Sequence, residues 1–214
     1  MNLEKSLTYH FEDKDWLVKI LIGGLVGVIP IVNLALLGYV LRALKNIAQG
    51  QEKPLPRWDE FGDHFVKGLK AFIGIFVYCI PILILACLAA LFDGSISSQY
   101  QSSAGTAVVA CFGCLGFLYG LLLGIVLPAA LTKYAISEEL ASFFRFGEIF
   151  SYMAKNLGDY IIALIVSALV CLAALAVGGI ACLIGVVFTI PWAKLVAAHL
   201  LAQVYKESLG QVTA

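Results

Sequence analysis

His64 is the histidine whose surroundings come closest to a catalytic or metal-binding pattern. Glu60 lies one helical turn before it, and Asp59 and Asp63 belong to the same stretch. A carboxylate at this spacing can orient an imidazole for proton transfer or share a metal ion with it. The same spacing is commoner on a solvated helix face, and no nucleophile elbow, P-loop, GxGxxG or HExxH motif accompanies it. We therefore expect no catalytic residue, no bound cofactor and no metal site.

Two cysteines, Cys111 and Cys114, form a CxxC motif. Zinc would require a second ligand pair, but neither another CxxC nor a histidine occurs in the same apolar run. All six cysteines lie in such runs: Cys79, Cys87, Cys111, Cys114, Cys171 and Cys182. They are expected to pack as small apolar side chains, and a redox pair at Cys111 and Cys114 is the alternative.

Lys194 is a basic residue in the last predicted span, just after Pro191 and Trp192. It could meet a substrate anion, but a lysine near a helix end usually extends its ammonium group to the membrane surface. The apolar runs contain no Asp or Glu, the side chains that ion-coupled carriers commonly place near the bilayer midplane.

The composition indicates that many of these residues lie in or beside membrane-spanning segments. The chain is 61% hydrophobic and 13% charged, with a mean hydropathy of +0.95, whereas soluble domains average about 25% charged residues. Uncharged runs long enough to cross a bilayer cover residues 20–41, 71–92, 107–132 and 160–193. The last run is divided at Gly178 and Gly179, a natural turn. We predict a single integral membrane domain over residues 1–214.

The distribution of lysine and arginine predicts the orientation. The chain has 14 of them, and none falls between residues 71 and 132. Cytoplasmic loops retain Lys and Arg while translocated loops lack them, so the polar loop at 93–106 should be external. We expect a multi-pass protein of the cell (inner) membrane with both termini cytoplasmic.

The first apolar run has two interpretations, because residues 30–33 (Pro-Ile-Val-Asn) interrupt it. It forms either one long helix kinked at Pro30 or a hairpin with arms of about 14 residues, roughly 20 Å each. The positive-inside rule mildly favours the hairpin, which keeps the N-terminus inside.

A repeated pentapeptide also favours the hairpin. Phe-Gly-Asp-His-Phe at 61–65 recurs as Phe-Gly-Glu-Ile-Phe at 146–150, with a fainter copy, Leu-Thr-Tyr-His-Phe, at 7–11. The predicted fold is therefore all-α: a polytopic helical membrane protein with about six hydrophobic segments. They form three hairpin-like repeats, about 3–50, 58–140 and 143–207, each led by an amphipathic interfacial helix.

Two sets of residues are expected to make contacts, one with the membrane interface and one between helices. Aromatic side chains at helical spacing should lie at the membrane interface, and small residues four apart should let helices approach closely. The interfacial set is Trp58, Phe61, Phe65, Phe146 and Phe150. The helix-packing set is Gly116, Gly120, Gly124, Ala163 and Ser167.

Four stretches resemble an uncharacterised family of prokaryotic polytopic membrane proteins, known only as a domain of unknown function, DUF4013. They are residues 9–16, 37–50, 54–62 and 128–134. The resemblance covers nearly the whole chain. It implies a prokaryotic integral membrane protein, and it supplies no catalytic residue because the family has no established activity.

The function expected from these observations is that of a non-enzymatic membrane scaffold or accessory subunit. Its partners would be membrane lipids, further copies of itself or a larger membrane complex, and the zero net charge argues against nucleic acid. The alternative is a carrier or channel for a small or lipid-like molecule, since repeats and proline-interrupted helices are common in transporters. An enzyme would require His64 and Glu60 to meet the acids at Glu138 and Glu139.

Overall fold

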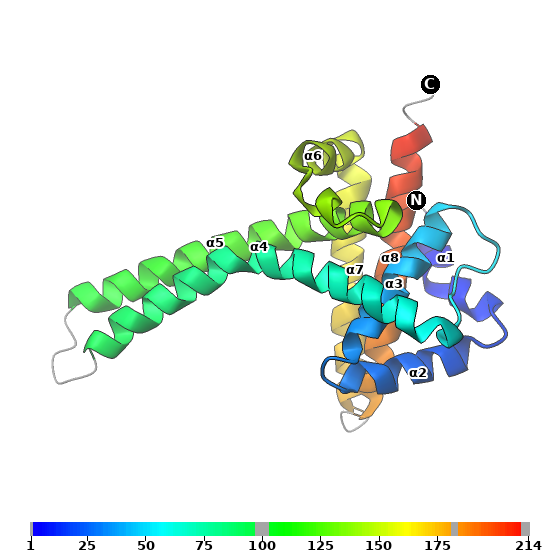
Figure 1. The fold of residues 1–214 in the computed structure, drawn as a ribbon, viewed down its shortest axis with the longest axis horizontal. Coiled ribbons are helices and arrows are strands. Elements are labelled where there is room, and N and C mark those ends of the chain that lie inside the picture. Colours follow the sequence, from blue (N-terminus) through cyan, green and yellow to red (C-terminus); the bar gives the residue numbers. More distant parts are fainter. Residues whose placement is uncertain (1, 97–102, 181–183, 211–214) are drawn as a thin grey trace. The chain divides into compact units, whose positions relative to one another are not determined.

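The computed structural model describes residues 2–96, 103–180 and 184–210, and in these ranges the chain is helical, with no strand. The elements in order are α1 (Leu3–Thr8), η1 (Tyr9–Glu12), α2 (Trp16–Val28), α3 (Asn33–Ala48), η2 (Trp58–Glu60), α4 (Phe61–Ile96), α5 (Ser103–Ser137), η3 (Leu140–Phe144), α6 (Phe146–Lys155), α7 (Leu157–Ile180) and α8 (Ile184–Gly210). Figure 1 labels the α-helices. The all-α prediction is confirmed.

Four helices are long and apolar enough to cross a membrane: Trp58–Leu91, Thr106–Ser137, Leu157–Ile180 and Gly185–Gly210. They correspond to the predicted runs that begin at residues 71, 107 and 160, the last of which contributes two helices. The expected turn at Gly178 and Gly179 is wrong, because α7 continues through Ile180. Gly178 instead lies against α8, where an added Cβ would come within 2.6 Å of the Val186 backbone.

The first apolar run forms two helices and not one kinked helix. Ile29 precedes Pro30 and adopts an extended conformation, as the ring of a following proline requires, so α2 ends at Val28. Ile31 then takes φ 70°, a rare value for a β-branched residue. The helices α2 and α3 contact each other, which agrees with the hairpin. Since α2 has only 13 residues, six full crossings and the threefold repeat remain predictions.

The chain divides into two compact units: residues 1–72 with 128–214, and residues 73–127. In the first unit, α8 is the central element and contacts α1, α2, α3, α6 and α7; Figure 1 shows it between α7 and α3. Its buried side chains include the apolar residues Ala193, Leu195, Val196, Ala198, Leu200, Leu201, Ala202 and Val204. The second unit consists of parts of α4 and α5, joined by a hydrogen bond from the Tyr119 hydroxyl to the Tyr78 carbonyl, 2.9 Å.

The end of α3 is set by a glycine. The Gly50 N–H bonds to the Ile47 carbonyl and the Gln51 N–H to the Asn46 carbonyl, both at 3.0 Å. These two bonds form a Schellman motif, which needs a left-handed residue after the cap, and Gly50 supplies it with φ 74°. Gly50 also lies near the Lys206 side chain of α8, whose Nζ is 3.5 Å from where a Cβ on the glycine would be.

Of the three helices predicted to lie at the membrane interface, the second and third take different forms in the structure. The second is not a separate helix, because α4 runs unbroken from Phe61 into the membrane-length segment and its proline, Pro81, comes 20 residues later. The third is α6, whose inner face buries Ile149, Tyr152 and Met153, while Phe146 and Phe150 remain about half exposed on the outer face.

Candidate functional site

The N-terminal segment is fastened to one face of α8 by hydrogen bonds between residues nearly 200 positions apart. The Tyr9 hydroxyl donates to the Leu195 carbonyl at 3.1 Å, and the Asn2 backbone N–H donates to Gln203 Oε1 at 2.7 Å. Ser6 Oγ lies 2.9 Å from His199 Nδ1. The α8 partners are spaced at three to four residues, so they form one stripe along the helix.

His10 completes this stripe. Trp192 Nε1 donates to His10 Nε2 at 2.9 Å, so Nε2 is unprotonated and the neutral ring carries its proton on Nδ1. The ring is fully buried, and Nδ1 has no hydrogen-bond partner among the described residues. Burial lowers the pKa of His10 to about 4 because it disfavours the charged imidazolium.

The hydrogen bonds also determine the protonation state of His199. Gln203 Oε1 accepts from Asn2, which leaves the Gln203 amide nitrogen facing His199 Nδ1 at 2.9 Å. An amide nitrogen only donates, so Nδ1 of His199 must accept and the ring proton sits on Nε2. Tyr9 stacks on this ring with centroids 4.4 Å apart and holds its orientation.

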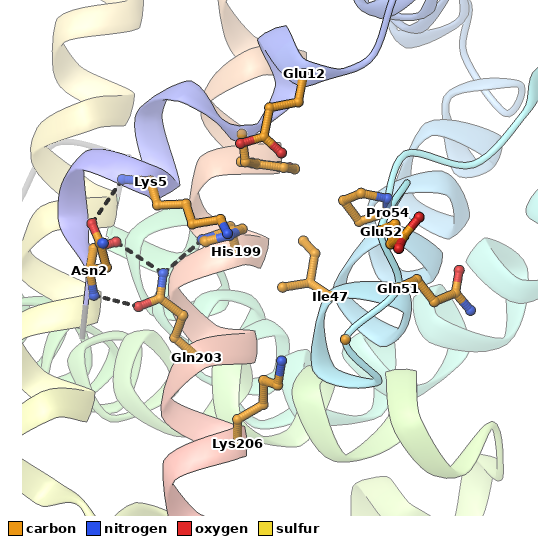
Figure 2. Close-up of a pocket in the computed structure, with 12 residues that line it drawn as sticks. Asn2, Lys5, Glu12, Ile47, Gln51, Glu52, Pro54, His199, Gln203 and Lys206 are labelled. Atoms are coloured by element: carbon orange, nitrogen blue, oxygen red, sulfur yellow. Dashed lines mark hydrogen bonds between the residues drawn. The ribbon is translucent and has the colours of Figure 1, made fainter.

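A cavity of about 490 Å³ opens beside His199. Its walls come from α1 and η1, from the loop after α3, and from the C-terminal part of α8 (Figure 2). The ionisable side chains that line it are Lys5, Glu12, Glu52, His199 and Lys206. Such a volume is within the usual range for small-molecule sites, and charged and polar groups converge on it from three separate elements.

A second cluster of charges lies where α3, the start of α4 and the end of α5 meet. Glu138 Oε1 accepts from Lys45 at 3.0 Å and from Lys67 at 2.8 Å. The two ammonium groups, Lys67 foremost, lower the pKa of Glu138 to about 2. Glu138 has φ 59°, an uncommon value outside glycine.

The residues first considered for catalysis do not come together. His64 is fully buried, and its Nε2 donates to the Arg57 carbonyl at 2.8 Å, while Glu60 pairs with Arg42. No three His, Cys, Asp or Glu side chains form a metal-binding group within the described ranges. Cys111 and Cys114 are exposed free cysteines, Lys194 is exposed, and Cys182 lies outside the described residues.

The helix-packing residues have different surroundings. A Cβ on Gly116 or Gly120 would lie 3.9 to 4.0 Å from Ile82, in ordinary contact, and one on Gly124 would meet nothing within 4 Å. Ala163 is fully buried, and the Ser167 hydroxyl is buried without a hydrogen-bond partner in the described part of the chain. Their role in helix packing stays a prediction.

The constellation around His199 was not predicted from the sequence. Its signal is the spacing of Trp192, His199 and Gln203, which places three polar groups on one face of an apolar helix. Their partners, Ser6 and Tyr9, belong to a segment that we interpreted only as amphipathic.

The fold and the site define the class: this is an α-helical membrane protein, with four membrane-length helices and a charged cavity lined in part by its N-terminal segment. The chain belongs to the family described as "Protein of unknown function (DUF4013)", whose profile matches residues 21–197. No curated protein and no solved structure matches it.

Proposed function

We propose that the protein is a non-enzymatic membrane scaffold or accessory subunit that contacts lipid, further copies of itself or another membrane protein. The observation that supports this role is the exposed apolar surface of its long helices. The most apolar window of Thr106–Ser137 contains no buried residue, and Leu91 and Phe117 in the second unit are about two-thirds exposed. In a bilayer, this surface is available to lipid tails and to other helices.

The outer face of α6 supports the lipid contact. Phe146 and Phe150 are 49% and 53% exposed, and the apolar face continues to Leu157, where the membrane-length helix α7 begins. Glu148 and Lys155 lie on the other side of the helix. An amphipathic helix joined directly to a spanning helix is expected to lie in the headgroup region.

The proposed location is the cell (inner) membrane, with both termini cytoplasmic. Lys5 and Lys206 line the same cavity, so the N-terminal segment and the end of α8 lie at the same end of the first unit. Their positive charges favour the cytoplasmic side for that end.

Native mass spectrometry of the full chain, released from mild detergent, tests the scaffold role. A stable homo-oligomer, a co-purifying protein or retained lipid is expected. The variant Phe146→Ser with Phe150→Ser should lose retained lipid, whereas Leu209→Ser, which alters a similarly exposed leucine on α8, should not. A bare monomer of the wild-type chain would contradict the proposal.

The alternative is a carrier or channel, favoured by the prolines inside three membrane-length helices, Pro81 in α4, Pro128 in α5 and Pro191 in α8. Interior prolines kink helices and free backbone carbonyls. Ser167 lies near the middle of α7, so the accessibility of this position to water can be used to detect a path through the membrane. In a cysteine-free background, Ser167→Cys should react with water-soluble thiol reagents if the protein is a carrier and stay inert if it is a scaffold.

A further inference from the structure

We propose that the cavity beside His199 binds a phosphate-type oxyanion, either a soluble phosphate monoester or the phosphate of a lipid headgroup. This inference goes beyond the scaffold role and does not depend on it. It rests on three donor groups that converge on one cavity from two elements.

The first donor is the imidazole of His199. Its Nδ1 accepts from Gln203, so its proton is on Nε2. All hydrogen bonds of the ring involve Nδ1, and Nε2 is not among the buried unpaired atoms of the described residues. Since His199 lines the cavity, the structure supplies an oriented Nε2–H donor there.

The other two donors are ammonium groups. Lys5 on α1 and Lys206 on α8 line the cavity with His199, and Figure 2 shows the three on the same side of the view. Within the described ranges neither lysine has a carboxylate within 4 Å, whereas Lys19, Lys45, Lys67 and Lys133 are all paired. Lys206 Nζ lies beside Gly50, 3.5 Å from where a Cβ would be, so its side chain extends toward the loop after α3.

This donor set fits phosphate better than a single carboxylate. A phosphate monoester carries close to two negative charges at neutral pH and presents three strong acceptor oxygens. Two ammonium groups balance the double charge of a monoester and exceed the single charge of a lipid phosphodiester, and the imidazole N–H supplies a third directed donor. Hydrogen bonds in which one partner is ionised are roughly twice as strong as neutral ones.

The lining of the cavity also carries negative charge. Glu12 and Glu52 line it, and neither has a cationic partner within 4 Å in the part of the chain that the structure describes. In Figure 2, the Glu52 side chain lies across the view from His199. A ligand that carries an amine beside its phosphate could pair with both the cationic and the anionic side chains, so we expect phosphorylethanolamine to bind more tightly than inorganic phosphate.

The test uses the full chain, labelled with 15N-histidine, in maltoside micelles and phosphate-free buffer. The three histidines provide an internal control, because His10 and His64 are fully buried. Titration with phosphorylethanolamine should shift the Nε2 resonance of His199 saturably and leave the other two rings unchanged. Lys5→Gln and Lys206→Gln should each raise the Kd about tenfold, whereas Lys155→Gln, an exposed lysine of α6, should change it less than about twofold.

Two further experiments distinguish a lipid headgroup from a soluble phosphate monoester and test whether the ligand's amine contributes to binding. If the ligand is a lipid headgroup, micelles doped with phosphatidylethanolamine should shift the same His199 resonance. If the ligand is a soluble phosphate monoester, phosphorylethanolamine should shift this resonance and the lipid should not. The double variant Glu12→Gln with Glu52→Gln should remove the advantage of phosphorylethanolamine over inorganic phosphate. The proposal is wrong if neither source shifts His199, or if Lys155→Gln weakens binding as much as Lys5→Gln.

Discussion

Gly38 and Gly68 face each other where α3 meets the first turns of α4. A Cβ on Gly38 would collide with the His64 carbonyl, and one on Gly68 with the Leu34 carbonyl. Each backbone therefore occupies the space that a side chain on the other glycine would need. This approach places Tyr39 and His64 in the same buried aromatic cluster, with ring centroids 5.4 Å apart.

Replacing either glycine should separate the two helices. Gly38→Ala or Gly68→Ala is expected to lower the free energy of unfolding by about 3 kcal/mol or more, since overpacking alone costs about 1 to 3 kcal/mol and here the obstacle is backbone. Denaturant titration in detergent measures the change. Gly62→Ala and Gly147→Ala are the controls: their added methyl groups meet nothing within 4 Å, and each should stabilise its helix by up to about 1 kcal/mol.

Acid should loosen the N-terminal segment through His10. Its folded-state pKa, about 4, lies below its ordinary value of 6.5, so the segment is fully stabilised above about pH 6.5 and loses stability as the pH falls toward 4. The loss is expected to reach about 3 kcal/mol at pH 4. His10→Gln keeps an acceptor for Trp192 but does not titrate, so its unfolding free energy should change less over this window. Equal pH dependence in both proteins would contradict this assignment.

Glu138 should control stability at lower pH. Its pKa of about 2 lies below the ordinary value of 4.5, so the ion pairs with Lys45 and Lys67 contribute fully above about pH 4.5 and are lost as the pH falls to 2. The carboxylate is half exposed, which limits the effect to at most about 1 kcal/mol. Glu138→Gln should remove this pH dependence. Glu138→Gly should do the same but be about 1 kcal/mol more stable than Glu138→Gln, because glycine accepts φ 59° without strain.

The orientation of α6 relative to the membrane can be measured by tryptophan fluorescence. A tryptophan in place of Phe150 should emit at short wavelength and be quenched by brominated lipid, since this position lies on the exposed apolar face. Ser151→Trp, toward the polar side with Glu148 and Lys155, should show weaker quenching. Equal quenching at both positions would place α6 away from the headgroup region.

Topology follows from accessibility at positions that the structure leaves open. In a cysteine-free background, Glu4→Cys and Lys206→Cys should react only from the cytoplasmic side, and Asn33→Cys should not react from that side. Ser6 is unsuitable as a reporter because its hydroxyl binds His199. External labelling of Glu4→Cys would rule out a cytoplasmic N-terminus.

The helical class and the long spans could be predicted from the sequence because uncharged apolar runs of this length are typical of membrane-spanning helices. The sequence was less informative where local signals compete. Gly178 and Gly179 are typical of a turn, yet they lie inside α7, where Gly178 allows α8 to approach. A glycine pair is compatible with either role, and only the neighbouring helix decides between them.

The candidate site was missed for a different reason. Ser6, Tyr9, His199 and Gln203 are unremarkable side chains individually, and their spacing says nothing about which distant segment they meet. The fold brings positions 6 and 199 together, and a single sequence contains no record of that pairing. The charged residues at the helix ends could be identified in the sequence, but their convergence on one cavity could not be predicted from it.

The bonds between the N-terminal segment and α8 have a consequence for biosynthesis. Asn2, Ser6 and Tyr9 are synthesised about 190 residues before their partners on α8, Gln203, His199 and Leu195. At about 5 to 20 residues per second, the segment waits roughly 10 to 40 s before it can dock. A nascent or truncated chain without α8 therefore leaves the hydrogen-bonding groups of these residues without their native partners.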